Sequence, residues 1–373
     1  MVKLKNKEPR GKKMLRYLLS SALLVLILYF TMRLILKDVS LEELKNSLFE
    51  ANPYWVAAGF GLIFVYIFCW SLILHLLIKS ITPRPPSFLV GINAAFVGFY
   101  FNNITPSASG GQPVQMYYLH RCGIDASGSS LVFLLNTVFN NIVMIGISTL
   151  VLAFKYDFIS ENLYGMKYAL IFGYILNGGL LVLNIFLIFY PLRLEKIVLS
   201  VVKWLGGKKL IKRPDQMRHK AEEFFNSYGN NSSTMTQSPI FLLKLLLLHL
   251  IQHCAYYLIP FTAAMALGAE KNILLPSFCL QAVLTLAVSG FPTPGAVGIS
   301  EGGFVTVFSG LLPKGMLEST MILTRFINFY SVLIISAIVT ILAFVIANKK
   351  RPTLYAKESD LAKIAASDSQ KSE

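Results

Sequence analysis

Charged side chains are scarce in this sequence. Lys, Arg, Asp and Glu together supply 14% of the 373 residues, whereas hydrophobic residues supply 55%, and the mean hydropathy is +0.60. These values are too apolar for a soluble domain, and several apolar runs exceed the ~18 residues expected of a membrane span. The shortage of charge therefore excludes an ordinary soluble domain and predicts a polytopic integral membrane protein.

Patterns for disulfides, nucleotides and metals are also missing. The four cysteines show no paired spacing, so we expect free thiols and no disulfide framework. The stretch WLGGKK (204–209) lacks the spacing of a phosphate-binding P-loop, so the sequence shows no motif for ATP-driven transport. His249 and His253 have the i, i+4 spacing of a metal-binding pair, but no third ligand is nearby. We therefore predict neither a metal site nor a cofactor.

Acidic residues are outnumbered by basic ones, 19 to 34, which gives a net charge of +15. In a membrane protein such an excess usually lies in cytoplasmic loops near anionic lipid, so we expect no nucleic-acid partner. Residues 1–16 carry seven Lys and Arg against one acid, and the loop 191–238 carries nine against four. The positive-inside rule places both segments, and both ends of the chain, in the cytoplasm.

Two kinds of apolar segment alternate along the chain. The arms of two interrupted regions, 88–119 and 276–312, contain only ~15 residues and reach ~22 Å, less than the ~30 Å hydrocarbon core. We therefore predict that these two regions are re-entrant helical hairpins. If a hydropathy count includes one or both of them with the six full spans, the total becomes seven or eight transmembrane helices. Because no cleavage pattern follows the first full span, we expect it to be retained. The six full spans are predicted at 17–36, 54–78, 130–153, 168–190, 240–267 and 320–347.

The order of these segments repeats. Residues 17–153 hold span, span, hairpin and span, and residues 168–347 hold the same order after an outer connection at 154–167. Three full crossings per repeat is an odd number, so the second repeat is inverted. We predict an all-α membrane bundle of two inverted repeats, N-in and C-in. It would begin with a basic cytoplasmic N-terminus (1–16) and end in a disordered cytoplasmic tail (348–373).

An amphipathic pattern lies inside the basic loop 191–238. Residues 192–205 have apolar side chains on one helical face and charges elsewhere, and Gly206-Gly207 would end the helix. The pattern predicts an interfacial helix on the cytoplasmic leaflet. Its apolar face comprises Leu194, Ile197, Val198, Val201, Val202 and Leu205.

Each hairpin is interrupted by a polar break. The first break is NNITPSASGGQP (102–113) and the second is FPTPGAVGISEGG (291–303), and each has a glycine five residues after the threonine of a Thr-Pro step. Non-helical backbone cannot face lipid, so each break is buried in protein or lines a wet cavity. The helix N-termini at such breaks attract anions such as phosphate, and matching breaks in inverted halves indicate a transport site.

Two charges lie at membrane depth. Arg325 is expected to attract a phosphate, with Asn328 on the same helical face, and Glu301 either neutralises Arg325 or contacts a cationic headgroup. A purely structural Glu301–Arg325 pair remains the alternative. We predict no catalytic residue. The candidate substrate-binding residues are Asn102, Asn103, Thr105, Ser107, Ser109, Gly110, Gly111, Gln112, Thr293, Gly295, Gly298, Ser300, Glu301, Arg325 and Asn328.

Other polar residues form faces on the apolar spans, and we expect them to make interhelical hydrogen bonds. Asn136 and Asn140 are four residues apart. A second face is formed by His249, Gln252, His253 and Tyr256.

The two breaks resemble a known family. FNNITPSASGGQPVQMYYL (101–119) and PTPGAVGISEGGF (292–304), with Arg325 on the last span, are similar to the transmembrane region of the lysylphosphatidylglycerol synthase/flippase family, over about residues 15–347. The resemblance implies a membrane part that translocates aminoacylated phosphatidylglycerol and, in bifunctional members, a soluble C-terminal part that makes it. Since only about 25 residues follow the last predicted span, we expect a stand-alone flippase-like member without the synthase part.

Three classes of function stay open at this point. The first is a flippase-like transporter of a phospholipid headgroup, such as lysyl-phosphatidylglycerol, another anionic lipid or a polyprenyl phosphate, in a bacterial plasma membrane with a separate lipid synthase as partner. The second is an enzyme: a phosphatidylglycerol lysyltransferase by family label, or an intramembrane serine protease using Ser109 and His253. The third is a membrane scaffold. The G-x-S-x-G pattern at 298–302 lies in a membrane hairpin and does not indicate a soluble hydrolase. The oligomeric state is not indicated by the sequence.

Overall fold

The computed structural model describes residue 49 and the ranges 51–82, 86–208, 214–236 and 238–347. Within these ranges every regular element is a helix, which confirms the predicted all-α membrane fold. The predicted first span (17–36), the basic N-terminus (1–16) and the C-terminal tail (348–373) lie outside the described residues.

Six described helices are long and apolar enough to cross a membrane. Five of them coincide with predicted spans. The last of these begins at Lys314 and not near 320. The sequence placed its start too late because the first turns carry several polar residues. The sixth covers the first arm of the second predicted hairpin and is long enough to count as a span, so the re-entrant path of this arm stays a prediction. The six are Pro53–Ile81 (α3), Ala126–Phe154 (α6), Lys167–Phe189 (α8), Pro239–Ala266 (α11 and α12), Lys271–Val288 (η4 and α13) and Lys314–Ala347.

Local sequence explains several of the helix boundaries. Asn52 caps α3 by accepting a hydrogen bond from the Tyr54 N–H at 3.0 Å, and Asp125 caps α6 in the same way through Gly128. The span Pro239–Ala266 divides into α11 (Pro239–Tyr257) and α12 (Ile259–Ala266), with Pro260 in the first turn of α12. The last span contains α15 (Lys314–Arg325) and a π-helical turn, η6 (Phe326–Tyr330), before it continues as α-helix to residue 347.

The two predicted hairpins form two pairs of shorter helices. The first consists of α4 (Phe88–Ile104), the 3-10 turn η2 (Pro106–Ala108) and α5 (Gly111–Arg121). The second consists of α13 (Leu274–Val288), η5 (Pro294–Ala296) and α14 (Ile299–Phe308).

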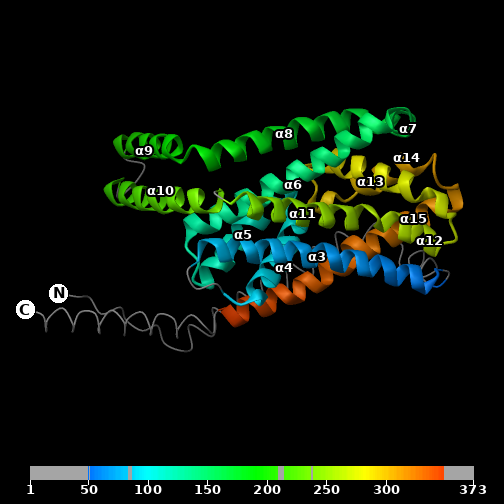
Figure 1. Cartoon of the computed structure of the whole chain (residues 1–373), viewed down its shortest axis with the longest axis horizontal. Coiled ribbons are helices and arrows are strands. Elements are labelled where there is room, and N and C mark those ends of the chain that lie inside the picture. The colour runs from blue at the N-terminus through cyan, green and yellow to red at the C-terminus, as the bar shows by residue number, and fades with distance from the viewer. Residues whose placement is uncertain (1–48, 50, 83–85, 209–213, 237, 348–373) are drawn as a thin grey trace, which may run out of the picture.

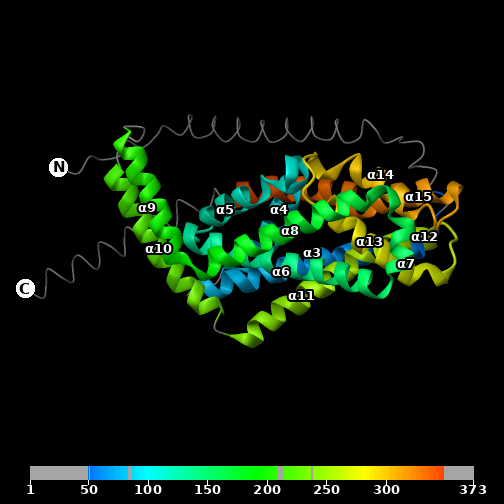
Figure 2. The same ribbon diagram turned by 90° about the horizontal axis from the view of Figure 1, so that it is seen from above.

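The hairpins extend toward each other from opposite halves of the elongated bundle (Figure 1). Their turns η2 and η5 are in contact, as Figure 2 also shows from above. We refer to residues 105–110 as the first tip and to residues 293–298 as the second tip. Two inverted repeats would place their hairpins in this way, and both the repeat and the orientation in the membrane stay predictions.

Two apolar clusters fill the bundle. One is built mainly by α3, α4, α5, the first half of α6 and the last span, and the other mainly by the second half of α6, α13 and α14, while α12 contributes to both. Trp55 and Tyr256 pack against both clusters. The turns η2 and η5 meet where the two hairpins end, so the polar residues of the breaks lie away from the ends of the bundle.

Three remaining helices lie at the two ends of the bundle. A short helix, α7 (Tyr156–Asn162), and the turn η3 (Tyr164–Met166) connect α6 to α8. At the other end, α9 (Pro191–Gly207) and α10 (Pro214–Thr236) form a helical pair beyond α8 (Figures 1 and 2).

The close packing of α8 on α13 generates a stability prediction. A Cβ atom at Gly173 would overlap the backbone carbonyl of Leu286, whereas a Cβ at Gly178, on the same helix, would meet nothing within 4 Å. Gly173→Ala should lower the free energy of unfolding by about 1–3 kcal/mol because the two helices must separate. Gly178→Ala should leave it unchanged or raise it, since alanine is the better helix former. Thermal unfolding of both variants in one detergent checks this, and equal melting temperatures would contradict the packing.

Candidate functional site

The two tips have nearly the same backbone. Thr105 (φ −113°, ψ 146°) and Thr293 (φ −104°, ψ 139°) are extended, as residues before proline usually are. Each is followed by a proline and then by residues with positive φ: Ser107 and Ala108 (51° and 54°) in the first tip, and Gly295 and Ala296 (59° and 51°) in the second. Non-glycine residues in this region cost of order 1–3 kcal/mol each and cluster at functional sites.

The first tip is held by neutral hydrogen bonds. The Thr105 hydroxyl donates to the Phe101 carbonyl at 2.6 Å and accepts from the Gly110 N–H at 2.9 Å, so this side chain closes the turn. The Gln112 side chain turns away from the break and donates to the Thr137 hydroxyl at 2.8 Å. Helix α5 then begins without a side-chain cap.

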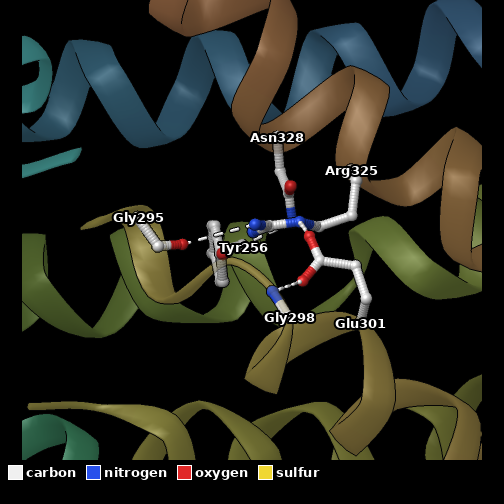
Figure 3. A network of polar contacts seen from close by, with 6 residues as sticks. All are labelled: Tyr256, Gly295, Gly298, Glu301, Arg325 and Asn328. Carbon is white, nitrogen blue, oxygen red and sulfur yellow. Dashed lines mark hydrogen bonds and ion pairs between the residues drawn. The ribbon is translucent and has the colours of Figure 1, made fainter. Parts of the chain in front are cut away.

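The second tip is held by an ion pair. Glu301 Oε1 accepts from Arg325 Nε at 2.6 Å, and Glu301 Oε2 accepts from the Gly298 N–H at 2.7 Å, which caps α14 (Figure 3). Arg325 Nη2 also donates to the Gly295 carbonyl at 3.3 Å. The pair therefore connects the last span to the second tip at Gly295 and Gly298. A structural ion pair between Glu301 and Arg325 was one of the two roles that the sequence left open.

Arg325 is buried at the C-terminal end of α15. Its side chain is 10% exposed, and its guanidinium carbon lies 4.1 Å from the centre of the Phe329 ring. The π-helical turn η6 follows directly, and such turns occur frequently at functional sites. A guanidinium carries five N–H groups, and the contacts above use two of them, so the rest of the fork is available to a ligand.

Gly295 allows the two tips to approach each other. A Cβ atom there would lie 2.5 Å from the Phe329 ring and 3.2 Å from the Asn103 carbonyl of the first tip's helix, and φ at this residue is +59°. Ser107, at the matching position of the first tip, has a similar positive φ, so it is chiefly the close contact that favours glycine here.

A cavity of about 300 Å³, lined by both polar and apolar side chains, lies between the tips. Eight of the fifteen candidate residues line it: Asn102, Asn103, Ser107, Thr293, Gly295, Ser300, Arg325 and Asn328. A smaller cavity of about 50 Å³ adjoins it at Ser300, Arg325 and Asn328.

The other seven candidates do not line this cavity. Thr105, Gly110, Gly298 and Glu301 hold the tips in the hydrogen bonds described above. Gly111 is buried against Asn102, and Ser109 and Gln112 are exposed. The first break thus divides into residues that line the cavity, Asn102, Asn103, Ser107 and Ala108, and residues that support them.

Sequence reasoning missed an aromatic wall. Tyr66 and Trp70 of α3 line the cavity with Tyr256, and the Tyr66 ring centre is 6.3 Å from that of Trp70 and 5.3 Å from that of Tyr256. Tyr66 and Trp70 stand in an uninterrupted apolar span, so nothing in the local pattern distinguishes them from packing residues. Asn140, His253 and Tyr256 were expected to form interhelical hydrogen bonds. The structure places all three on the cavity wall, and Tyr256 accepts a hydrogen bond from Asn328 of the last span.

Several buried polar atoms at the cavity have no partner within the described residues. These include Asn328 Oδ1 and Thr293 Oγ1, although Asn328 Nδ2 donates to the Tyr256 hydroxyl at 3.3 Å. An unsatisfied buried polar group costs about 1–3 kcal/mol. Groups of this kind on a cavity wall are available to water or to a polar ligand.

A second polar cluster lies beside the cavity on α11. His249 is 1% exposed and neither ring nitrogen has a partner in the described part of the chain, while His253 Nδ1 contacts the His249 carbonyl at 2.9 Å. Within the described ranges neither Ser109 nor Ser300 forms a hydrogen bond to His253, which is the contact a serine protease would need. The cavity therefore offers one buried cation, paired with Glu301, together with neutral amide and hydroxyl groups.

Comparison with known proteins gives one family and two relatives. Residues 15–336 match the family described as the lysylphosphatidylglycerol synthase TM region. A UPF0104 membrane protein of Archaeoglobus fulgidus is 24% identical over 313 residues, which cover 82% of this chain and 91% of the relative. Another UPF0104 membrane protein, from Methanothermobacter thermautotrophicus, is 31% identical over 77 residues, 21% of this chain and 22% of the relative. Both relatives are archaeal, so the bacterial plasma membrane stays a prediction.

The Arg325–Glu301 pair generates a second stability prediction. Glu301→Gln should lower the free energy of unfolding by on the order of 3 kcal/mol, because a buried guanidinium then loses its counter-charge. The matched control is Glu222→Gln, which breaks the exposed Arg218–Glu222 pair on α10. That change should cost less than about 1 kcal/mol. Denaturation of both variants in detergent measures the difference, and equal losses would show that the buried pair does not hold the second tip.

Proposed function

We propose that this chain, which belongs to the lysylphosphatidylglycerol synthase transmembrane-region family, moves the headgroup of an anionic phospholipid between the leaflets of a membrane. The observation that carries the proposal is the cavity at the meeting point of the two tips, where a buried arginine stands among unpaired polar groups. Ionisable residues within a membrane bundle usually mark a substrate pathway.

The headgroup phosphate is the group that this site suits best. Arg325 supplies a planar fork of N–H donors that matches phosphate geometry, and Asn102 and Ser107 of the first hairpin supply neutral polar groups. Asn103 also lines the cavity, although its Nδ2 donates to the Phe99 carbonyl at 2.8 Å. A cavity of about 300 Å³ is too small to enclose the acyl chains as well as the headgroup, so the chains stay in lipid. The headgroup thus passes through protein while the tails pass along it.

The charge of the site limits the substrate further. Glu301 balances Arg325, so the pair adds no net charge at the cavity. A headgroup with both a phosphate and an amine, such as that of lysyl-phosphatidylglycerol, can neutralise both side chains. Its phosphate would pair with Arg325 and its ammonium with Glu301. Phosphatidylglycerol or a polyprenyl phosphate carries the anion alone and leaves Glu301 to compete for the same guanidinium. An aminoacylated lipid would come from a separate synthase.

The test is lipid translocation in proteoliposomes. Purified protein is reconstituted with labelled phosphatidylglycerol, lysyl-phosphatidylglycerol or a polyprenyl phosphate in one leaflet, and appearance in the other leaflet is measured. We expect the protein to move at least one of these lipids. We expect Arg325→Gln to slow that movement by tenfold or more, since the lost charged hydrogen bonds are worth about 1.5–3 kcal/mol.

The control is Arg218→Gln, which removes an exposed arginine on α10 far from both tips. It should move lipid at the wild-type rate. The melting temperature of each variant separates loss of transport from loss of fold. If folded wild-type protein moves none of the three lipids, or if Arg325→Gln moves them normally, the proposal is wrong.

A further inference from the structure

A single residue, Tyr190, separates the end of α8 from the start of α9, and the pair α9–α10 lies across the end of the bundle (Figure 2). Helix α10 holds this pair to the spans through side-chain hydrogen bonds. The Tyr228 hydroxyl donates to the Leu187 carbonyl at 3.0 Å, and the Ser127 hydroxyl donates to that of Ser227 at 2.8 Å. Burial raises the pKa of Tyr228 to about 12, so its hydroxyl stays protonated and remains a donor at neutral pH. The position of α9 is therefore fixed relative to the membrane-spanning helices.

Helix α9 has three different faces. Val202, 7% exposed, belongs to the face that packs on α10. Ile197, Val201 and Trp204, at i, i+4 and i+7, form a stripe that is 54%, 48% and 57% exposed. The sequence had grouped Val202 with this stripe, but α10 covers it.

Basic residues occupy the third face. Arg193, Lys196 and Lys203 fall within about 80° of each other on a helix of 3.6 residues per turn, next to the apolar stripe. The only acid of α9, Glu195, lies near the α10 side and is partly buried. The exposed surface of the helix thus combines an apolar stripe with a purely cationic margin.

Aromatic side chains with cations above them mark the two ends of this surface. The Lys208 ammonium lies 4.3 Å from the Trp204 ring centre, and the Arg193 guanidinium lies 4.8 Å from the Tyr190 ring centre. Tyrosine and tryptophan favour the boundary between lipid tails and water, and long basic side chains extend from that boundary toward headgroups.

We propose that Ile197, Val201 and Trp204, with Arg193, Lys196 and Lys203, form a binding surface for anionic lipids in the leaflet at this end of the bundle. Charge complementarity selects this occupant, because an anionic leaflet attracts the Lys and Arg side chains and the apolar stripe can be buried below the headgroups. A lipid surface also fits the place of α9, directly at the end of span α8. The surface is separate from the cavity and does not depend on transport.

The experiment uses Trp204 as its own reporter. Trp55→Phe and Trp70→Phe leave Trp204 as the single tryptophan of the full chain. The protein is placed in nanodiscs of phosphatidylcholine alone or with phosphatidylglycerol. Quenching by aqueous acrylamide reports exposure to water, and quenching by lipids with brominated tails reports insertion.

We expect phosphatidylglycerol to reduce acrylamide quenching of Trp204 severalfold and to increase quenching by brominated tails. The triple variant Arg193→Gln, Lys196→Gln, Lys203→Gln should lose this response. The matched control neutralises three exposed lysines at the other end of the bundle, with Lys155→Gln, Lys167→Gln and Lys271→Gln, and should keep it.

Three outcomes would overturn the proposal. Equal quenching in both bilayers would remove the preference for anionic lipid. An unchanged response in the triple variant would exclude the basic face as its cause. Protection from acrylamide without quenching by brominated tails would show that protein, such as a second copy of the chain, covers the stripe. Because Trp204 is read directly, none of these outcomes depends on whether the cavity transports lipid.

Discussion

The ion pair between Arg325 and Glu301 is the contact on which the cavity depends. Arg325 belongs to the last span, and Glu301 belongs to the first turn of α14, directly after the second tip. An unpaired guanidinium at this depth is costly, so the pairing sets where the second tip lies against the last span. Because Glu301 also caps α14 through Gly298, and Arg325 also holds the Gly295 carbonyl, two side chains position both ends of the tip.

The broken backbone imposes a second constraint, which the two tips meet in different ways. Peptide groups that leave a helix at membrane depth need partners within the protein. The first tip closes on the neutral Thr105 hydroxyl, whereas the second closes on a carboxylate. Tips of similar backbone therefore bring different chemistry to one cavity: uncharged donors from one side and a charge pair from the other. Under the proposed function, this asymmetry would orient a phosphate toward Arg325.

The parts of the site that sequence could predict are those that violate the apolar pattern. Gly and Pro at both breaks, and the charges Glu301 and Arg325, stand out because a membrane span has no ordinary use for them, and the structure brings all of them together. Tyr66 and Trp70 gave no such signal, since aromatic residues pack equally well in an apolar helix. The local pattern also could not show that α6 offers the Thr137 hydroxyl to the Gln112 side chain. Contacts between distant segments thus decided the placement of these residues.

The same pair also links an incoming anion to the position of the second tip. An anion that takes the Arg325 fork competes with the Gly295 carbonyl on one side and with Glu301 on the other. If Glu301 is displaced, α14 also loses its cap, which is worth about 0.5–2 kcal/mol. This cost is of the same order as the charged hydrogen bonds that a phosphate would offer, which are worth about 1.5–3 kcal/mol, so exchange between the two partners would be nearly balanced. Under the proposed function, a phosphate would therefore loosen the second tip on arrival and allow the tip to close again on departure. A headgroup amine that pairs with the released Glu301 would lower this cost, which gives a physical reason for preferring a lipid that carries both charges.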